Sequence, residues 1–408
     1  MKNIWIINQS INIPGDCGNL RHYSLAKYLQ EGNWNSTLIT SNIEHSRNKK
    51  RIIKEKDKLH NLKNVQIIWL RVFRWSKKIN FLRVVGMVEF MFKIIFFLPF
   101  IRINKPDLII GSSPNLFAAL GAAIISIFYR VPFVFEIRDL WPESLIQLKV
   151  FKKNSIFYLI FKIIEIFLVL FAKKIIVVME KGFQYYKNIG LENSKFCYFP
   201  NGIDMKERKY KKFIKKSRNN PFNLLYLGSI GHPNAVDIII KSIYELKLQG
   251  LNKDKVILNI YGDGPLKEEM IKLSFKLNLD NVIFNKPIAN TDILKLYDSA
   301  DGFIFAMLDL PGIYNYGISF NKIFEYLSFS KPIIYNSNSL FNPMIYSRAG
   351  IKSPSLNEKD FANAIKYLLN LSQDEVEKLT RNGFNYVSEN HSYEYLAKKL
   401  DKILSNLL

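Results

Sequence analysis

Short apolar runs alternate with longer stretches of helical periodicity along most of the chain. In the first half, the runs at residues 4–8, 36–40, 65–70, 108–111, 133–136 and 174–179 are expected to be β-strands. A second series follows at residues 222–228, 256–261, 282–285, 302–305 and 331–335. Strands separated by helices are typical of parallel sheets that helices cover. The pattern therefore predicts an α/β protein with two Rossmann-like domains whose sheets face an interdomain cleft.

The boundary between the two series is marked by a change in composition. Asn201-Gly202-Ile203-Asp204 is followed by a run that is rich in lysine and arginine and poor in apolar residues. Such a stretch predicts a linker at residues 201–221, between an N-terminal domain at 1–200 and a C-terminal domain at 222–386. Apolar residues recur at helical intervals in residues 387–408, which predicts a final helix.

Composition narrows the class of protein. The chain has 408 residues, of which 48% are hydrophobic and 23% are charged, so it is expected to be globular with sizeable cores. Cys17 and Cys197 have neither metal-ligand spacing nor a disulfide framework, which fits a reducing compartment. The apolar run at the start is too short for a secretory signal and is interpreted as a first strand.

The formal net charge of +23 indicates an anionic partner, which the charge alone does not identify. Cations interleave with aromatic and aliphatic residues in residues 71–105, a pattern typical of an interfacial membrane surface. The alternative is a solvated, lysine-rich face on a core helix. The cations are Arg71, Arg74, Lys77, Lys78, Arg83, Lys93, Arg102 and Lys105.

Two apolar stretches, residues 84–101 and 155–171, resemble membrane spans in hydropathy. Glu89 and Lys93 interrupt the first, and Lys162 and Glu165 interrupt the second. Charges near the middle of an apolar helix are costly in lipid, so we expect peripheral docking or burial within the fold and no transmembrane segment.

The segment from Gly317 to Ile334 combines a loop, a helix start, a cation, an acid and a following strand. Gly317 permits close backbone approach, and Ser319 is expected to cap a helix whose first amides face an anion. Lys322 and Glu325 are three residues apart and share one helix face. A diphosphate would contact the amides and Lys322, while Glu325 would accept hydrogen bonds from ribose hydroxyls. The alternative is an ordinary helix with a surface ion pair.

Two motifs follow strands of the N-terminal domain. Gly15 and Gly18 lie after the first strand, where a loop can approach a phosphate or a sugar, although a plain strand-to-helix turn also favours glycine. Arg138, Asp139 and Glu143 follow an apolar strand in Arg138-Asp139-Leu140-Trp141-Pro142-Glu143. Asp139 can orient or deprotonate an acceptor hydroxyl, and Arg138 can stabilise the charge that develops on a pyrophosphate. The alternative is that Asp139 caps a helix that begins near Pro142 and Glu143.

Tyr316-Gly317-Ile318-Ser319-Phe320-Asn321-Lys322 and the Arg-Asp-Leu-Trp-Pro-Glu motif resemble family 4 glycosyltransferases of bacterial capsule and O-antigen synthesis. The family signature usually has two glutamates eight positions apart; the second matches Glu325, and Gly317 replaces the first. The turn from Gly228 to Gly231 resembles the family's pyrophosphate turn but lacks the usual arginine and lysine.

The resemblance covers nearly the whole chain and implies a GT-B fold with retaining transfer of a hexosyl or N-acetylhexosaminyl group. The implied donor is a nucleotide sugar, which we expect to be UDP-linked, and no metal or other cofactor is implied. The implied donor-binding residues are Gly15, Gly18, Gly228, Gly317, Ile318, Ser319, Lys322 and Glu325; Asp139 and Arg138 are the catalytic candidates and Glu143 is the acceptor-binding candidate. The last helix is expected to return to the N-terminal domain.

The acceptor is expected to be a lipid-linked or growing saccharide, with the enzyme peripheral on the cytoplasmic face of the plasma membrane. Two alternatives stay open at this stage. A nucleotide-sugar 2-epimerase shares the two-domain plan but leaves the basic aromatic surface unexplained. A basic nucleic-acid-binding protein would leave the Gly317–Glu325 motif unused, and the sequence has no recognition module for nucleic acid, so no nucleic-acid partner is expected.

Overall fold

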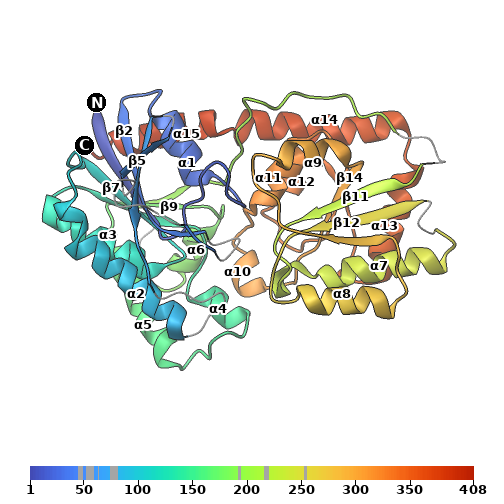
Figure 1. Cartoon of the computed structure of the whole chain (residues 1–408), viewed down its shortest axis with the longest axis horizontal. Coiled ribbons are helices and arrows are strands. Elements are labelled where there is room, and N and C mark those ends of the chain that lie inside the picture. The colour runs from blue at the N-terminus through green and yellow to red at the C-terminus, as the bar shows by residue number, and fades with distance from the viewer. Residues whose placement is uncertain are drawn as a thin grey trace. The chain divides into compact units, whose positions relative to one another are not determined.

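The computed structural model describes residues 1–408 except residues 45–48, 52–58, 63, 74–80, 192–193, 216–219 and 252–254. The described chain divides into two compact units. The first consists of Met1–Asn201, Asn315–Ile318 and Tyr393–Leu408, and the second of Gly202–Tyr314 and Ser319–Ser392. Each unit has a parallel sheet flanked by helices (Figure 1). The prediction of an α/β chain with two parallel-sheet domains is confirmed.

The sheet of the first unit has the strand order β10-β9-β8-β7-β1-β2-β6-β5. All neighbouring pairs are parallel except β5 and β6. At the centre, β1 pairs with β2 and β7, and Ile7 lies opposite Ile39 and Gly111. The strands are β1 (Lys2–Ile7), β2 (Trp34–Ser41), β5 (Leu59–Leu62), β6 (Val65–Leu70), β7 (Leu108–Ser112), β8 (Phe133–Ile137), β9 (Lys174–Val177) and β10 (Phe196–Tyr198); a separate ribbon contains β3 (Ile43–Glu44) and β4 (Lys49–Lys50).

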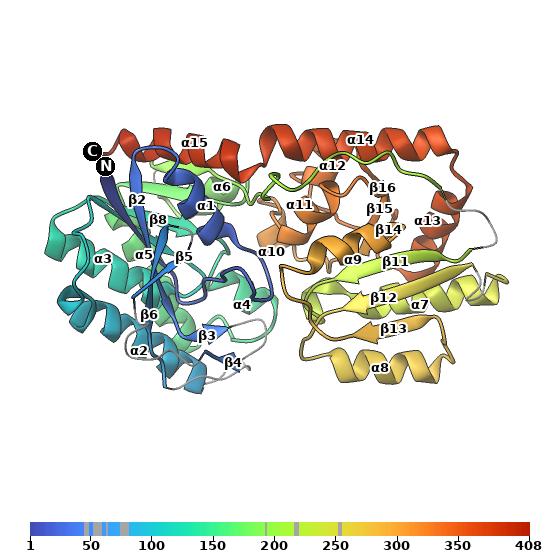
Figure 2. The same ribbon diagram turned by 45° about the horizontal axis from the view of Figure 1, so that its top comes forward.

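The longer helices of the first unit form two groups (Figure 2). Helix α3 lies between α2 and α5, while α1 packs against α15. Asn115 caps α3 by accepting hydrogen bonds from the amides of Phe117 and Ala118, and Ser155 caps α5. The helices are α1 (Arg21–Leu29), α2 (Phe81–Phe96), η2 (Leu98–Phe100), α3 (Leu116–Tyr129), α4 (Glu143–Gln147), α5 (Ile156–Phe171), α6 (Gly182–Lys187) and α15 (Tyr393–Ser405).

Helix α15 belongs to the first unit although it is the last element of the chain. Its buried face includes Leu396, Leu400 and Leu404, which share a hydrophobic core with residues of β1 and β2. The Trp34 indole donates a hydrogen bond to Asp401 at 2.7 Å. The predicted final helix at 387–408 is interrupted, because α14 ends at Asn390 and α15 begins at Tyr393.

The sheet of the second unit is entirely parallel and has the order β13-β12-β11-β14-β15-β16. Its strands are β11 (Phe222–Leu227), β12 (Val256–Tyr261), β13 (Val282–Asn285), β14 (Gly302–Phe305), β15 (Ile333–Tyr335) and β16 (Gly350–Lys352). Its helices are η3 (His232–Asn234), α7 (Val236–Leu248), α8 (Lys267–Lys276), α9 (Ile293–Ser299), α10 (Pro311–Tyr314), α11 (Asn321–Leu327), α12 (Pro343–Ser347), α13 (Glu358–Asn370) and α14 (Gln373–Asn390).

The basic stretch that the sequence predicts as a linker is packed along the second unit where it is described. Phe213 joins the unit's hydrophobic core, and the amide of Lys215 donates to Gln373 at 2.9 Å. In the basic aromatic segment of the first unit, Arg74, Lys77 and Lys78 fall outside the described residues. Among the described residues, no helix is long and apolar enough to span a bilayer.

Candidate functional site

Helix α11 brings Lys322 of the predicted donor site to the turn that follows β11. A methyl group added at Gly228 would lie 3.4 Å from the Lys322 amino nitrogen, so the turn and the cation are in direct proximity. The lysine donates to Asn234 Oδ1 at 2.6 Å and lies 4.9 Å from the centre of the Tyr226 ring. Two of the predicted donor residues, Gly228 and Lys322, are therefore neighbours in the structure.

The Lys322 amino group is unusually easy to deprotonate. Burial lowers its pKa from 10.5 to about 7, and the nearby Glu325 carboxylate only partly opposes this shift. A bound anion would restore the charged form, because an opposite charge at close range favours the ammonium ion. The site therefore has an amine whose charge depends on what lies beside it.

Glu325 lies one turn further along α11, where residues from distant parts of the chain surround it. Its Oε2 accepts a hydrogen bond from the Tyr297 hydroxyl at 2.6 Å. Burial raises the pKa of Glu325, against the effects of Tyr297, Arg208 and Lys322. Within the described part of the chain, Oε1 has no hydrogen-bond partner, so this oxygen can accept a hydrogen bond from a ligand hydroxyl.

Arg208 is a cation of this site that the sequence did not reveal. Its side chain donates to Ser328 and to the Asp204 carbonyl, and its guanidinium lies 4.5 Å from the centre of the Phe329 ring. Its charge acts on Glu325, as the pKa shifts of both groups show. Because Arg208 lies in the basic stretch after β10, no spacing rule connects it with α11.

The glycine turn after β11 packs backbone to backbone against the turn after β12. The Gly228 amide donates to the Tyr261 carbonyl at 3.0 Å, and the Ile230 amide donates to the Asp263 carbonyl at 2.9 Å. A methyl group at Gly262, whose φ is +154°, would lie 1.9 Å from the Gly228 carbonyl oxygen. Only glycine fits there, so these contacts fix the shape of the turn beside Lys322.

The residues just before α11 differ from the prediction. Gly317 has a φ of +110°, as expected for a glycine-dependent loop, and Ile318 is buried. Both cluster with the first unit, whereas Ser319, Lys322 and Glu325 cluster with the second. The expected capping role of Ser319 is wrong, because the helix begins at Asn321 and the cap position falls on Phe320, which has no polar side chain.

In the first unit, Arg138 and Asp139 follow the end of β8. The Arg138 amide donates to Ser113 Oγ at 2.8 Å, and its buried side-chain Nε has no hydrogen-bond partner among the described residues. Burial raises the pKa of Asp139 from 3.8 to about 6, against a hydrogen bond from Ser144 at 3.2 Å. A carboxyl with such a pKa can exchange protons near neutral pH. Asp139 is not the N-cap of α4, since that position is Pro142.

Glu143 and the glycine loop complete the predicted residues of the first unit. Glu143 is the first residue of α4, is half-buried, and accepts a hydrogen bond from Gln147 at 3.4 Å. Gly15 and Gly18 have φ values of +96° and +97°, conformations that favour glycine. Between them, Asp16 forms an ion pair with Arg51, which holds the loop after β1 in place.

A buried ionic cluster beside Arg138 was missed at the sequence level. Glu136 of β8 accepts hydrogen bonds from Arg21 Nε at 2.9 Å and from His22 Nε2 at 2.8 Å. Burial alone would raise the pKa of Glu136, but Arg21 and His22 outweigh burial and hold the pKa well below its usual value. Burial lowers the pKa of His22, with Glu136 opposing. A carboxylate inside an apolar strand was the available signal, because such a group requires charged partners.

Arg21 joins three chain segments of the first unit. Besides Glu136, it donates to the carbonyl oxygens of Phe199 and Pro200 and to Asn201 Oδ1. These contacts connect α1 with β8 and with the segment after β10. We assign the cluster a structural role that holds the end of β8, and with it Arg138 and Asp139, in position.

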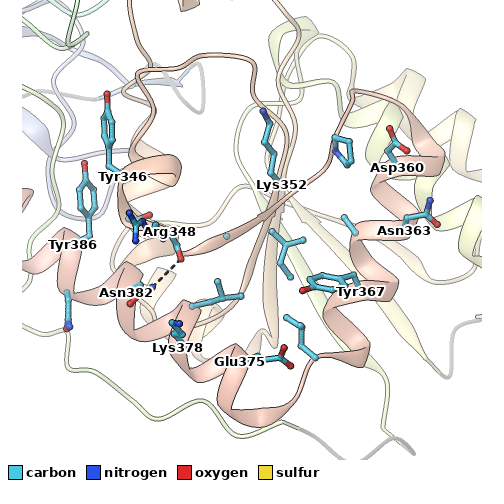
Figure 3. Close-up of a pocket in the computed structure, with 18 of the residues that line it drawn as sticks. Tyr346, Arg348, Lys352, Asp360, Asn363, Tyr367, Glu375, Lys378, Asn382 and Tyr386 are labelled. Atoms are coloured by element: carbon cyan, nitrogen blue, oxygen red, sulfur yellow. Dashed lines mark hydrogen bonds between the residues drawn. The ribbon is translucent and has the colours of Figure 1, made fainter.

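A large groove lies elsewhere in the second unit (Figure 3). It has a volume of about 1160 Å³ and lies along the edge strand β16, between α13 and α14. Tyr367, Lys378 and Asn382 line it, and Asn382 donates to the Arg348 carbonyl at 3.4 Å. The groove includes none of the predicted site residues. Among the described residues, no cluster of histidine, cysteine, aspartate and glutamate could hold a metal ion.

Comparison with known families identifies the two halves separately. Residues 21–207 match the model described as Glycosyltransferase Family 4, and residues 221–371 match the model described as Glycosyl transferases group 1. The chain is a family 4-type glycosyltransferase. No curated protein matches the sequence.

Solved structures support the GT-B fold of this glycosyltransferase. Sucrose-phosphate synthase from Thermosynechococcus elongatus is 14% identical, with a TM-score of 0.75 over 100% of this chain and 99% of that one. Anabaena HepE in complex with UDP-glucose is 15% identical, with a TM-score of 0.69 over 100% of both chains. WaaG, a glycosyltransferase involved in lipopolysaccharide biosynthesis, is 16% identical, with a TM-score of 0.65 over 98% of this chain and 99% of that one.

Proposed function

We propose that the protein transfers a hexosyl or N-acetylhexosaminyl group from a UDP-sugar, with retention at the anomeric carbon, to a lipid-linked or growing saccharide. The product would be a capsule or O-antigen type surface polysaccharide, made on the cytoplasmic face of the plasma membrane. The matched glycosyltransferase families support the reaction class. Structures similar to this chain were solved with UDP-glucose and with UDP-2-fluoro glucose, which supports a UDP-sugar donor.

The observation that supports the donor site most strongly is the arrangement of Gly228, Lys322 and Glu325. A phosphate beside the Gly228 turn would lie next to the Lys322 amine and would favour its protonated form. The Oε1 oxygen of Glu325 would accept a hydrogen bond from a ribose hydroxyl, while Tyr297 holds Oε2. One helical turn of α11 would thus bind both the charged and the hydroxylated parts of the donor.

The proposed reaction breaks the bond between the anomeric carbon and the diphosphate oxygen and forms a bond to an acceptor oxygen. Negative charge accumulates on the departing UDP, where Lys322 would stabilise it. We propose that this stabilisation makes a metal ion unnecessary. The acceptor hydroxyl loses a proton in the same reaction, and Asp139, with a pKa of about 6, would orient that hydroxyl or receive its proton.

Arg138 would stabilise the charge that develops on the pyrophosphate, and Arg138 and Glu143 would also hold the acceptor. The unpartnered Nε of Arg138 offers a charged donor to a sugar hydroxyl or to an acceptor phosphate. The half-buried Glu143 carboxylate would accept hydrogen bonds from sugar hydroxyls. This assignment separates the roles of two neighbouring acids, since Asp139 would act on the reacting hydroxyl and Glu143 on the hydroxyls around it.

The donor assignment is tested by calorimetric titration of UDP, GDP and ADP into the wild-type protein and Glu325→Ala, with and without EDTA. We expect selective UDP binding that EDTA leaves unchanged. Loss of the charged hydrogen bond to ribose should weaken UDP binding in Glu325→Ala by roughly tenfold to a hundredfold. Glu245→Ala is the matched control, because it removes a glutamate from α7 of the same unit.

Three outcomes would contradict parts of the proposal. Unchanged UDP affinity in folded Glu325→Ala would refute the ribose contact. Binding that EDTA abolishes would refute metal independence. A folded wild-type protein that binds none of the three nucleotides would refute the donor site as a whole.

A further inference from the structure

The outward face of α5 is apolar along its whole length. Ile156, Leu159, Ile160, Ile163, Phe167 and Leu170 are all exposed, at spacings that place them on one side of the helix. Ile163 is 67% exposed and Leu170 is 58% exposed. The opposite side is also largely apolar, with Phe161, Ile164 and Leu168 buried in the first unit. A surface helix of a soluble domain normally exposes polar residues on its outer side. An apolar outer side of this size indicates a surface that binds another molecule.

Neighbouring elements also expose apolar residues. Helix α3 packs against α5 and α2, and its last turn exposes Ile127 and Phe128. On the far side, α2 exposes Phe92 and Phe96, and Phe100 at the end of η2 is 85% exposed. We call the exposed apolar residues of α2, η2, α3 and α5 the apolar platform.

Exposed cations lie next to the ends of the helices that form the apolar platform. Lys152 and Lys153 are exposed just before α5, Arg130 is exposed just after α3, and Arg102 and Lys105 are exposed just after η2. The two acids on these helices are each paired with a lysine of the same helix, Glu89 with Lys93 and Glu165 with Lys162. We call these five exposed cations the rim; each lies within five residues of a platform element in the chain, where Asp107 is also exposed.

We infer that the apolar platform docks the first unit on an anionic lipid bilayer and inserts the outward side chains of α5 into the acyl boundary. Aliphatic and phenylalanine side chains suit a hydrocarbon layer, and rim cations suit anionic headgroups. The residues that dominate binding at protein interfaces are instead enriched in tyrosine, tryptophan and arginine, with leucine under-represented, and none of those three types is among the outward side chains of α5. With 16 residues, α5 is about 24 Å long, too short to cross the ~30 Å hydrocarbon core.

The platform is connected with the candidate acceptor residues through aromatic packing. Trp141, two residues after Asp139, lies 5.6 Å from Phe161 of α5 between ring centres. Phe161 in turn stacks on Phe151 at 6.3 Å. Docking through α5 would therefore hold the segment containing Asp139 and Glu143 close to the membrane surface. This inference rests on the proposed function, in which the saccharide acceptor is attached to a lipid.

The test is flotation of the full-length protein with vesicles of phosphatidylcholine, alone or mixed with phosphatidylglycerol. We expect the wild type to float with the mixed vesicles. The double variant Ile163→Glu/Leu170→Glu should reduce the bound fraction at least about tenfold, because burying a single aliphatic side chain already corresponds to about that factor. The control Leu248→Glu/Phe275→Glu adds the same charges at exposed apolar positions of α7 and α8 and should float like the wild type.

The charge of the rim is tested separately with Lys152→Glu/Lys153→Glu, which should reduce binding to the mixed vesicles more than binding to phosphatidylcholine alone. Equal flotation of the α5 variant and the wild type would overturn the inference. A wild-type protein that does not bind vesicles would also overturn the inference. So would a wild-type dimer in size-exclusion chromatography that is absent in the α5 variant.

Calorimetric UDP binding in the same preparations distinguishes this inference from the proposed function. UDP binding without vesicle binding would refute the platform alone. Vesicle binding without UDP binding would refute the donor assignment but not the inference that the platform binds a membrane.

Discussion

Replacing Asp139 by asparagine should stabilise the protein while it impairs the reaction. The half-buried Asp139 lies just after β8, and burial of its carboxylate raises the pKa from 3.8 to about 6. A rise of about two pKa units corresponds to about 3 kcal/mol of destabilisation of the ionised form. Asparagine has no charge to bury and keeps an oxygen that can accept the hydrogen bond from Ser144, so we expect a net gain in stability of about 1–3 kcal/mol at pH 8.

The dependence of this gain on pH follows from the direction of the pKa shift. Between about pH 4 and pH 6 the folded protein holds the Asp139 proton more tightly than the unfolded chain does, so stability declines as the pH rises through this range. Above about pH 7 the penalty is complete and constant. The stability difference between Asp139→Asn and the wild type should therefore be large at pH 8 and should shrink towards pH 4.

Tryptophan fluorescence during urea unfolding is a suitable assay, because all five tryptophans, Trp5, Trp34, Trp69, Trp75 and Trp141, precede residue 202. The fluorescence signal therefore reports the unfolding of the first unit. Glu143→Gln is the control, since it neutralises the neighbouring acid of the same segment. A variant that is less stable than the wild type at pH 8, or a gain of equal size at pH 8 and pH 4.5, would refute the reasoning.

The kinetic consequence should be opposite in sign. If Asp139 receives the acceptor proton, transfer should fall by roughly a hundredfold to ten-thousandfold in Asp139→Asn, while UDP affinity stays within a factor of about two. Full transfer activity in the folded variant would show that the raised pKa has no catalytic role.

Two further predictions concern the other ionised groups. UDP affinity should fall as the pH rises from about 6.5 to 8.5, because the Lys322 amine, with its pKa of about 7, must take up a proton to bind diphosphate. Calorimetry in buffers of different ionisation enthalpy measures this proton uptake, and a pH profile as flat in the wild type as in Lys322→Met would contradict the prediction. Glu136→Gln should lower the free energy of unfolding of the first unit by about 3–5 kcal/mol, because it leaves the Arg21 and His22 side chains without their buried carboxylate. A loss under about 1 kcal/mol in fluorescence-monitored urea unfolding would contradict this prediction.

The central strands were predictable because a strand that is buried on both faces of a parallel sheet needs a continuous run of apolar residues. All eleven predicted runs overlap observed strands, and their ends differ from the observed ends by at most two residues. The missed strands are short and lie at sheet edges or in the small ribbon. At β5, exposed Leu59, His60 and Asn61 give no apolar pattern, and β10 and β16 have three residues each. Edge strands need fewer buried side chains, so hydrophobicity alone does not reveal them.

The donor candidates were predictable only where the contacts are local. Helical spacing correctly puts Lys322 and Glu325 on neighbouring turns of α11. Tyr297 and Arg208 contribute to the same site from 28 and 117 positions earlier in the chain, and no periodicity links them to Glu325. The same holds for Arg21 and His22, which reach Glu136 across the sheet. Pair contacts across a sheet are set by topology, which the strand pattern leaves undetermined.

Helix α5 shows how a structure can resolve an ambiguity that hydropathy leaves open. The sequence allowed either peripheral docking or burial for residues 155–171, because mean hydropathy does not distinguish the sides of a helix. In the structure both sides are apolar, but only one is covered, and Lys162 and Glu165 pair with each other on the covered side, where Tyr186 also donates to Glu165 at 2.9 Å. The two charges that argue against a membrane span thus satisfy each other inside the unit and leave the outward side free of charge. A helix of this kind can contribute to the core and still bind a lipid surface, so the two interpretations of its sequence are compatible.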